Sequence, residues 1–398
     1  MRKERKKWLS IALCAAMAFT MTGLSGTKST ADDNEGMFVP TITATPSKDV
    51  DVNLLEGGIL EYASNYEKSK SANYLPADYP TGYGVSDNLK KRPDDYSPKA
   101  LTLSWESEEG AQYYTVKLAT KEDLSDAASY VTLDTSLEIP DLYVGTMYYY
   151  QIIAKFADKA VKSQIFSFKT ANLIRTIYIE GVSNTRDAGG YYTVDGKRIR
   201  QGMVYRGGKL EDITAAGKEK ALKVYGFKTD LDLRAETTVS PLGASLNFVN
   251  VSGPYYVGDT GVNSNKDSSN GPWKGTYREA LLKEIQTFAK PENYPIYVHC
   301  SLGRDRTGTL IFLINALCGV GEMDLYMDYE ASFFSTVGCL DAQLPQTLVE
   351  GAFTTLYNHI KNYSNGTLAQ NTERFMLDLG VTQAEIDSIR SIMIEEVE

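Results

Sequence analysis

The side chains best suited to catalysis lie in one short stretch, Ile296-Tyr-Val-His-Cys-Ser-Leu-Gly-Arg-Asp-Arg-Thr-Gly308. In this stretch five residues separate Cys300 from Arg306. A short apolar run precedes the cysteine and the apolar helical pattern 309–318 follows the arginine. This order predicts a strand, a tight loop and a helix. Such a loop can turn its backbone N–H groups inward, and together with the helix N-terminus it forms a cradle for a phosphate-sized dianion.

Cys300 is expected at the base of this cradle. Inward N–H groups and the helix dipole stabilise negative charge there, so the thiol should ionise far more readily than a free cysteine. A thiolate beneath a bound phosphate can attack phosphorus in line. The guanidinium group of Arg306 can donate two parallel hydrogen bonds to two phosphoryl oxygens, and the hydroxyl of Thr307 can donate to the sulfur. His299 is expected to orient the loop rather than act as a base.

The predicted phosphate-binding residues are those of the loop: Ser301, Leu302, Gly303, Arg304, Asp305 and Arg306. For an isolated cysteine, a small buried residue beside an ordinary glycine turn is the simpler interpretation. The spacing after a strand and before a helix argues against it here. Sulfur-transfer enzymes of the rhodanese type use a similar cradle, but they usually lack the Arg-Thr-Gly ending.

Three further motifs precede the loop in order. They are Asn184-Thr-Arg-Asp-Ala-Gly-Gly190, Val204-Tyr-Arg-Gly-Gly208 and Asp230-Leu-Asp-Leu-Arg234. With the cysteine loop and the tail that begins at Phe375, they resemble the bacterial broad-specificity family of cysteine-dependent tyrosine phosphatases. That family is similar to both dual-specificity and phosphoinositide phosphatases. The resemblance spans residues 175–398.

The resemblance implies a phosphomonoester hydrolase that works through a cysteinyl-phosphate intermediate, without metal or cofactor. Phosphotyrosine in a protein or peptide is the expected substrate, with broad specificity. The alternative is a phosphoinositide or an inositol polyphosphate, as in a phytase. The family often has Lys where this chain has Arg304. The compact ammonium charge of Lys is thus replaced by a planar guanidinium group that binds through two hydrogen bonds. A non-enzymatic surface-binding protein is the third possibility.

The sequence leaves the identity of the proton donor open. The resemblance places it in the acidic turn-rich segment 255–261, where Asp259 is the candidate. Asp305 can instead position water, protonate the leaving group or fix the loop through a salt bridge. Asp187 and Arg186 are expected to brace the loop from below, and Arg234 to do the same or to reach the substrate.

Beyond these motifs, the length of 398 residues predicts two or three folded units. The basic segment Met1–Lys7 and the apolar run Trp8–Leu24 predict a signal peptide over 1–31, with an uncleaved anchor as the alternative. We expect a spacer at 32–87, a β-domain at 88–171 and the phosphatase domain at 172–398. The protein is therefore expected to be secreted or associated with the cell surface or wall.

Residues 88–171 contain short alternating segments separated by turns, which predicts an all-β sandwich. Trp105 on an early strand and Tyr148 on a late one resemble the fibronectin type III domain, in which they would be core and corner residues. A cell-wall or extracellular ligand is a possible partner of this unit. From residue 175 strands alternate with helical patterns, which predicts an α/β domain around a mostly parallel sheet.

The amino-acid composition argues against several classes of protein and site. The net charge is −10, which argues against a nucleic-acid binder. Four cysteines exclude a disulfide scaffold, and two histidines make a histidine-built metal centre a poor interpretation.

Overall fold

The computed structural model describes residue 46 and the ranges 51–71, 98–234, 237–253, 276–335 and 352–397. These residues form two compact units. The smaller unit contains Thr102–Ile139 and Met147–Lys169, and the larger contains the remaining described residues from Val52 onward. The predicted signal peptide at 1–31 and most of the predicted spacer lie outside the described residues.

The smaller unit is built from β-strands, as predicted. Its larger sheet has the order β3-β2-β5-β6, with β7 also paired to β5, and β1 and β4 form a second sheet. The strands are β1 (Leu101–Ser104), β2 (Tyr113–Ala119), β3 (Ala128–Thr132), β4 (Ser136–Ile139), β5 (Met147–Lys155), β6 (Ala160–Lys162) and β7 (Phe166–Lys169). Aromatic rings fill the interior: Trp105 meets Tyr114 edge-on at 5.4 Å, and Tyr148 stacks on Phe168 at 5.4 Å.

The larger unit is the predicted α/β domain around a mostly parallel sheet. The sheet order is β12-β11-β13-β10-β8. Its strands are β8 (Arg186–Asp187), β10 (Val204–Gly207), β11 (Thr229–Asp232), β12 (Asn247–Asn250) and β13 (Ile296–His299). All pairs are parallel except β8 with β10. A separate pair joins β9 (Arg198–Ile199) to β14 (Ile394–Glu395).

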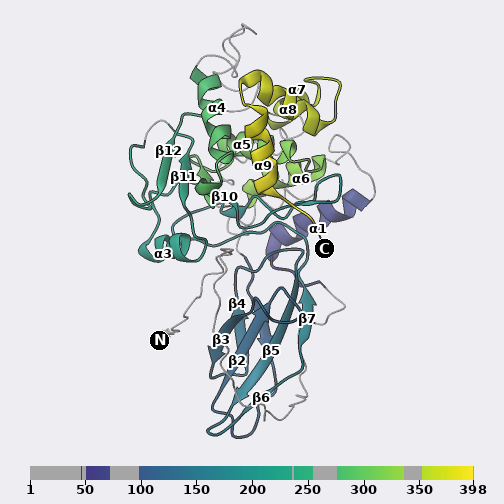
Figure 1. The fold of residues 1–398 in the computed structure, drawn as a ribbon, viewed down its shortest axis with the longest axis vertical. Coiled ribbons are helices and arrows are strands. Elements are labelled where there is room, and N and C mark those ends of the chain that lie inside the picture. Colours follow the sequence, from purple (N-terminus) through teal and green to yellow (C-terminus); the bar gives the residue numbers. More distant parts are fainter. Residues whose placement is uncertain are drawn as a thin grey trace, which may run out of the picture. The chain divides into compact units, whose positions relative to one another are not determined.

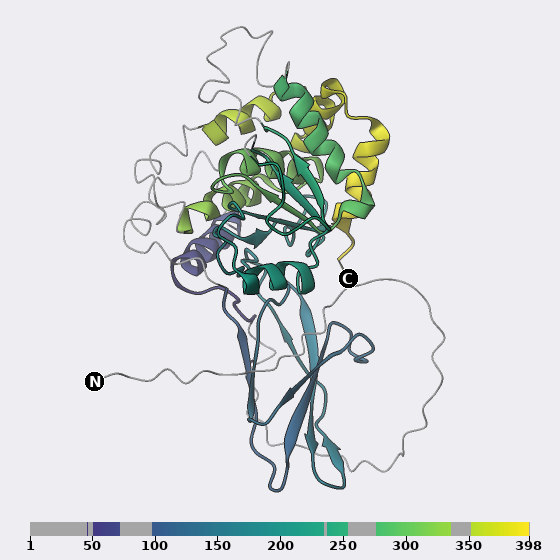
Figure 2. The same cartoon turned by 90° about the vertical axis from the view of Figure 1, so that its left-hand side faces the viewer.

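The helices of this unit lie on both sides of the sheet (Figures 1 and 2). They include α3 (Ala215–Lys223), α4 (Thr276–Phe288), α5 (Asp305–Leu317), α6 (Glu322–Glu330), α7 (Ala352–Lys361), α8 (Leu368–Leu379) and α9 (Gln383–Met393). Two short 3₁₀ helices are η3 (Pro291–Asn293) and η4 (Ala331–Phe334). Within the described ranges, none of the helices is long and apolar enough to cross a membrane.

The central strand β13 has apolar side chains on both faces, because each face is covered by helices. Ile296 and Val298 belong to the large core that contains residues of α4 to α9. Tyr297 points the other way, into a second core with Ala221 and Tyr225 from the region of α3. This two-sided packing fixes the end of β13, where the candidate cysteine follows.

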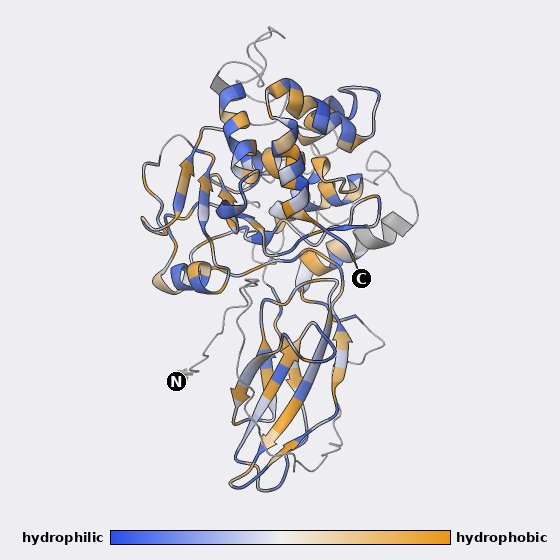
Figure 3. Ribbon diagram, in the orientation of Figure 1, coloured by the Kyte–Doolittle hydropathy of each residue, from blue (hydrophilic) through white to orange (hydrophobic). Residues whose placement is uncertain are grey.

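Helix α5 is the central helix of the large core. Every residue from Thr307 to Leu317 is buried, which requires a helix that is apolar nearly all round. The peripheral helices α4, α7 and α8 instead carry both hydrophobic and hydrophilic residues along their length (Figure 3), as expected for helices with one buried face. The fully packed α5 therefore sets the position of the residues at its own N-terminus.

The structure differs from the predicted spacer at 32–87. Helix α1 (Gly57–Ser71) lies in this range, and it begins after a bridge between Leu55 and Pro98. Leu55, Ile59, Tyr62 and Ala63 are part of the large core of the α/β unit. The Tyr62 ring lies 4.9 Å from the ring of Phe334 in η4, and its hydroxyl donates to Glu330 at 2.5 Å. This part of the predicted spacer is therefore part of the α/β unit.

Replacing Ile59 by Ala tests this assignment. The side chain is fully buried, so its truncation should lower the free energy of unfolding by about 2–5 kcal/mol. Urea denaturation of the full chain measures the effect, and Glu61→Ala on the exposed side of the same helix is the control. An Ile59→Ala midpoint equal to that of the control would contradict the packing.

Candidate active site

Cys300 follows β13 directly and is buried, with 4% of its surface exposed. The loop 301–304 leads into α5, which begins at Asp305, earlier than the apolar pattern indicates. Arg306 and Thr307 therefore lie in the first turn of the helix. The side chain of Arg304, at the N-cap position, makes no capping hydrogen bond to the first N–H groups of α5. Strand, tight loop and helix are thus arranged as the sequence predicts.

Three successive carbonyl groups of the loop are held by residues outside it. The carbonyl of Ser301 accepts from the Lys209 N–H at 3.2 Å. The carbonyl of Leu302 accepts from Asn184 Nδ2 at 2.9 Å, and that of Gly303 accepts from Arg206 Nη2 at 2.8 Å. In a planar trans peptide the next N–H points away from the carbonyl. Fixing these oxygens on one side therefore turns the following three N–H groups to the other.

Gly303 is required at its position for two reasons. Its φ of +71° lies in the left-handed region that favours glycine. In addition, a Cβ atom there would lie 2.2 Å from the carbonyl oxygen of Gly207. The loop thus lies directly against the end of β10, where the sequence has two glycines after Arg206.

A buried ionic cluster lies where the loop carbonyls are held. Asp328 on α6 accepts from Arg186 Nε at 3.0 Å and also pairs with Arg206 Nη1. Arg186 Nη1 donates to Asn184 Oδ1 at 2.5 Å, so Asn184 links this cluster to Leu302. Both guanidinium groups are fully buried. One carboxylate therefore fixes both side chains that reach the loop from below.

This cluster also supplies charge. Burial alone would raise the pKa of Asp328, but the charges of Arg206 and Arg186 outweigh burial and hold the pKa below its ordinary value. The carboxylate is thus ionised, and two guanidinium groups share it. One net positive charge remains beneath the cradle, where it favours a bound anion.

The imidazole of His299 has a hydrogen-bonding neighbour at each ring nitrogen. Its Nε2 is hydrogen-bonded to Asp230 Oδ1 at 2.9 Å, and its Nδ1 lies 3.3 Å from the carbonyl oxygen of Cys300. The ring stacks on Tyr297 and is buried. Ser240 donates to the second oxygen of Asp230 at 2.5 Å. The imidazole is therefore held from both sides directly before the cysteine.

The Asp-Leu-Arg motif contacts the loop through its backbone. Arg306 Nη1 donates to the carbonyl of Leu233 at 3.2 Å. Arg234 instead pairs with Asp232 at 2.8 Å and with Glu211 at 2.7 Å. Burial raises the pKa of Asp232, but the hydrogen bond from Arg234 and further contacts hold the pKa below its ordinary value. Arg234 is therefore part of an ionic cluster of its own.

Arg304 and Asp305 contact each other within the loop. Arg304 Nε lies 3.1 Å from Asp305 Oδ1, and its guanidinium lies over the Phe333 ring, 5.4 Å from the ring centre. Arg304 is 7% exposed. Of the interpretations of Asp305 that the sequence leaves open, this ion pair matches the one that fixes the loop.

Two predicted contacts are not made. The buried hydroxyl of Thr307 has no hydrogen-bond partner, so it does not donate to the sulfur of Cys300. Asp187 pairs with Arg175 at 2.6 Å and accepts from the N–H groups of Gly189 and Gly202. It therefore braces the chain around Arg175 rather than the loop. Asp259 lies outside the described residues.

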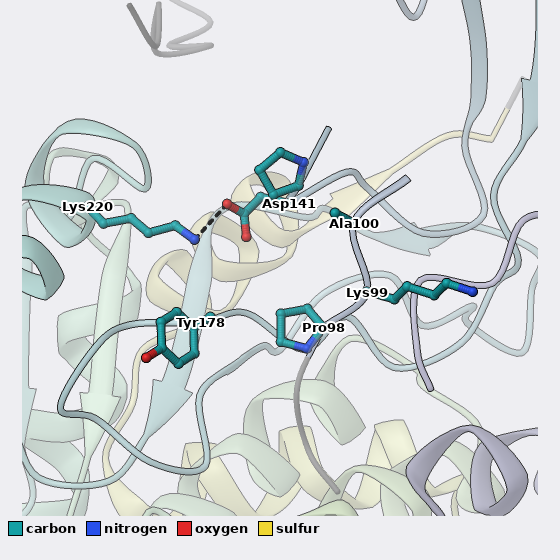
Figure 4. A pocket seen from close by; sticks show the side chains of 7 residues that line it. Pro98, Lys99, Ala100, Asp141, Tyr178 and Lys220 are labelled. Carbon is teal, nitrogen blue, oxygen red and sulfur yellow. Dashed lines mark ion pairs between the residues drawn. The ribbon is translucent and has the colours of Figure 1, made fainter. Parts of the chain in front are cut away.

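A surface pocket elsewhere in the larger unit has a different character (Figure 4). Its lining includes Pro98, Pro140 and Tyr178, and none of its lining residues belongs to the loop 300–306. Lys220 and Asp141 face each other across it and form an ion pair at 2.8 Å. The pocket therefore lies apart from the cysteine loop, which remains the candidate active site.

Comparison with known proteins agrees with this geometry. Residues 177–395, more than half of the chain, match the model of the tyrosine phosphatase family. The chain belongs to this family. The matched region begins before the Asn184 motif and includes the cysteine loop and helices α3 to α9. The match thus covers most of the larger unit, but it does not include helix α1 or the smaller unit.

Individual relatives cover smaller parts. A Cupriavidus necator protein whose name assigns it to the tyrosine-protein phosphatases is 29% identical over 165 residues, which are 37% of this chain and 59% of that protein. The inositol diphosphatase SIW14 of Saccharomyces cerevisiae is 29% identical over 99 residues, 25% of this chain and 34% of that protein. The chain thus spans less than two thirds of these relatives. The solved catalytic core of SIW14 has a TM-score of 0.25 and 21% identity, covering 36% of this chain and 78% of that core.

The sequence analysis missed two residues of the site. Asp328 lies far along the chain, on a helix with no recognisable motif, and its signal is an acidic side chain on a buried helix face. Glu284 on α4 is buried close to the loop, and nothing in the sequence distinguishes it from the exposed Glu279 of the same helix. Only the packing of helices against the sheet brings either residue to the loop.

Replacing Asp328 by Asn should damage both fold and loop. The change leaves two buried guanidinium groups without their carboxylate, which costs about 3–5 kcal/mol of stability. Urea denaturation measures this loss. Glu219→Gln removes an exposed ion pair with Lys223 and should leave the midpoint unchanged. Equal midpoints for the two variants would contradict the role of Asp328.

Proposed function

We propose that this chain is a phosphomonoester hydrolase that acts through a cysteinyl-phosphate intermediate, with phosphotyrosine in a protein or peptide as its main substrate class. The observation that carries the proposal is the anchoring of three loop carbonyls by Lys209, Asn184 and Arg206. It turns amide donors toward one side of a loop that begins at Cys300. A thiol among such donors is suited to act as a thiolate on a bound phosphoryl group.

In the first step the sulfur of Cys300 forms a bond to phosphorus as the bond between phosphorus and the ester oxygen breaks. The loop N–H groups and Arg306 stabilise the charge on the phosphoryl oxygens. Arg306 Nη1 donates to the neutral carbonyl of Leu233, and a guanidinium group makes stronger, charge-assisted hydrogen bonds to a phosphate. The leaving oxygen takes a proton from an acid.

In the second step water attacks phosphorus, the bond from sulfur to phosphorus breaks, and inorganic phosphate leaves. The residue that first gave its proton takes one from this water. Asp259 and Asp305 are the candidates for this acid, and the ion pair of Asp305 with Arg304 favours Asp259. The buried hydroxyl of Thr307, which has no partner in the structure, can donate to the departing thiolate.

The charges around the loop favour a single phosphoryl group. Arg234 is paired with Asp232 and Glu211, and the exposed Lys209 lies 3.4 Å from Asp212. Arg304 contacts Asp305. Each of these cations near the loop has a carboxylate partner, so they offer little attraction to further phosphates. An aryl monophosphate needs only the loop amides and Arg306.

An inositol phosphate is the second candidate, and the similarity to the inositol diphosphatase SIW14 favours it. A substrate with several phosphates requires further cations. Rates compared at equal substrate concentration on phosphotyrosine peptides, phosphoserine peptides, inositol lipids and phytate separate the two candidates. We expect the phosphotyrosine peptides to react fastest, and faster turnover of phytate would favour the second candidate.

The proposed chemistry predicts the effect of two substitutions. Cys300→Ser should abolish hydrolysis of an aryl phosphate. Arg306→Lys should lower kcat/KM by about 100-fold or more, because lysine cannot make the bidentate hydrogen bonds of the guanidinium group. Release of the aryl alcohol measures both. Asp259→Asn and Asp305→Asn, assayed with good and poor leaving groups, identify the acid, since only loss of the acid affects the poor leaving group more. Activity that survives Cys300→Ser would overturn the nucleophile.

We further propose that the smaller unit is a fibronectin type III-like spacer or docking module. The buried Trp105 and Tyr148 and the arrangement in two sheets support this. The basic and apolar N-terminal segments support export, with the protein secreted or held at the cell surface or wall. A cell-wall or extracellular ligand is the corresponding partner of the β-unit.

Export has a direct test. The mature protein from the culture medium or cell surface should begin near residue 32, because the signal peptide is removed. N-terminal sequencing measures this. Replacing Leu13 by Arg interrupts the apolar run and should keep the chain in the cell, whereas the control Lys28→Arg lies outside that run and should be exported normally. An unprocessed protein inside cells that express the unaltered chain would contradict export.

A further inference from the structure

Glu284 on α4 is a buried carboxyl group that the proposed chemistry does not use. Only 1% of its surface is exposed. Its Oε1 has no hydrogen-bond partner, which is unusual for a buried polar atom. Since an unsatisfied buried carboxyl destabilises the fold, its presence next to a candidate active site suggests a role in that site.

A short chain of contacts connects Glu284 to Arg306. The backbone of Gly253 lies so close to the carboxyl group that a Cβ atom there would be 2.4 Å from Glu284 Oε1. The Gly253 N–H donates to the carbonyl of Leu233 at 3.3 Å. That same carbonyl accepts from Arg306 Nη1 at 3.2 Å. The backbone of Gly253 and the carbonyl of Leu233 therefore lie between the carboxyl group and the guanidinium group.

Two opposing effects act on the pKa of Glu284, and burial is the larger one. Burial raises the pKa of Glu284 well above its ordinary value, and the positive charge of Arg306 on α5 offsets only part of this effect. Lys283, the charged neighbour on α4, is exposed. Burial thus favours the uncharged form of the carboxyl group, and in that form Glu284 does not offset the positive charge of Arg306.

We propose that Glu284 is a positioning residue for Arg306 that works in its uncharged form: it allows the guanidinium to turn toward a phosphoryl group, and on ionising it draws the guanidinium back. This inference rests on the proposed function, in which Arg306 binds the phosphoryl oxygens. Glu284 itself does not touch the substrate. Anion binding and ionisation of Glu284 then oppose each other, because both use the charge of Arg306.

Sulfate binding by the full chain carrying Cys300→Ser tests the proposal. The substitution removes the thiol from the loop, and sulfate keeps both charges between about pH 5 and about pH 9. We expect sulfate affinity, measured by calorimetry, to fall by about tenfold or more from about pH 6 to about pH 9. Adding Glu284→Gln should remove this fall and leave the affinity at low pH unchanged.

The control is Glu279→Gln in the same Cys300→Ser background, because Glu279 is an exposed glutamate of the same helix. It should keep the pH dependence. A fall in affinity that persists with Glu284→Gln would overturn the proposal. So would a constant affinity in the Cys300→Ser protein alone, and that measurement needs no folded Glu284 variant.

Turnover is not measured in this experiment. Failure of the proposed function, seen as no hydrolysis by the wild-type chain, is therefore distinct from failure of the role of Glu284. Where the wild type is active, the KM for an aryl phosphate should rise at alkaline pH, and Glu284→Gln should remove that rise while kcat changes little. If Glu284 had a purely structural role, Glu284→Gln would change the free energy of unfolding but would leave the alkaline rise in KM in place.

Discussion

The site depends on one constraint, the outward fixing of the loop carbonyls. A loop of four residues cannot hold its own amides inward, because an amide has no preferred side without a partner for its carbonyl. Here the partners come from three other positions, Lys209, Asn184 and Arg206. Two of these side chains, those of Asn184 and Arg206, are in turn fixed through the buried Asp328 cluster. A single carboxylate on α6 thus helps to fix two of the three groups that anchor the loop carbonyls.

The rest of the larger unit maintains that arrangement. Helices cover both faces of β13, so the strand end that bears Cys300 cannot shift. Helix α5 is buried along its length, which fixes Arg306 and Thr307 in its first turn. Phe333 lies under the Arg304 guanidinium, and its neighbour Phe334 packs against α1. Chain segments well outside the motif region therefore contribute to the rigidity of the loop.

The distribution of charge around the loop favours a bound anion. The buried cluster has two guanidinium groups and one carboxylate, and Arg234 and Arg304 are each matched by acidic neighbours. Arg306 Nη1 donates to a neutral carbonyl, and burial raises the pKa of Glu284 well above its ordinary value, which favours its uncharged form. An acidic chain with a net charge of −10 can bind an anion in this way, because the local field at the loop opposes the overall one.

The sequence by itself determined the alternation of strands and helices, the loop between Cys300 and Arg306, and the glycine needed at 303, because these follow from local periodicity and backbone geometry. It also determined that the segment before residue 172 contains a β-unit. Only the tertiary structure decided that α1 belongs to the α/β unit, that Asp187 serves Arg175, and that Asp328 and Glu284 lie near the loop. These are contacts between residues far apart in the chain, and local patterns carry no information about which distant side chains meet when helices pack on a sheet.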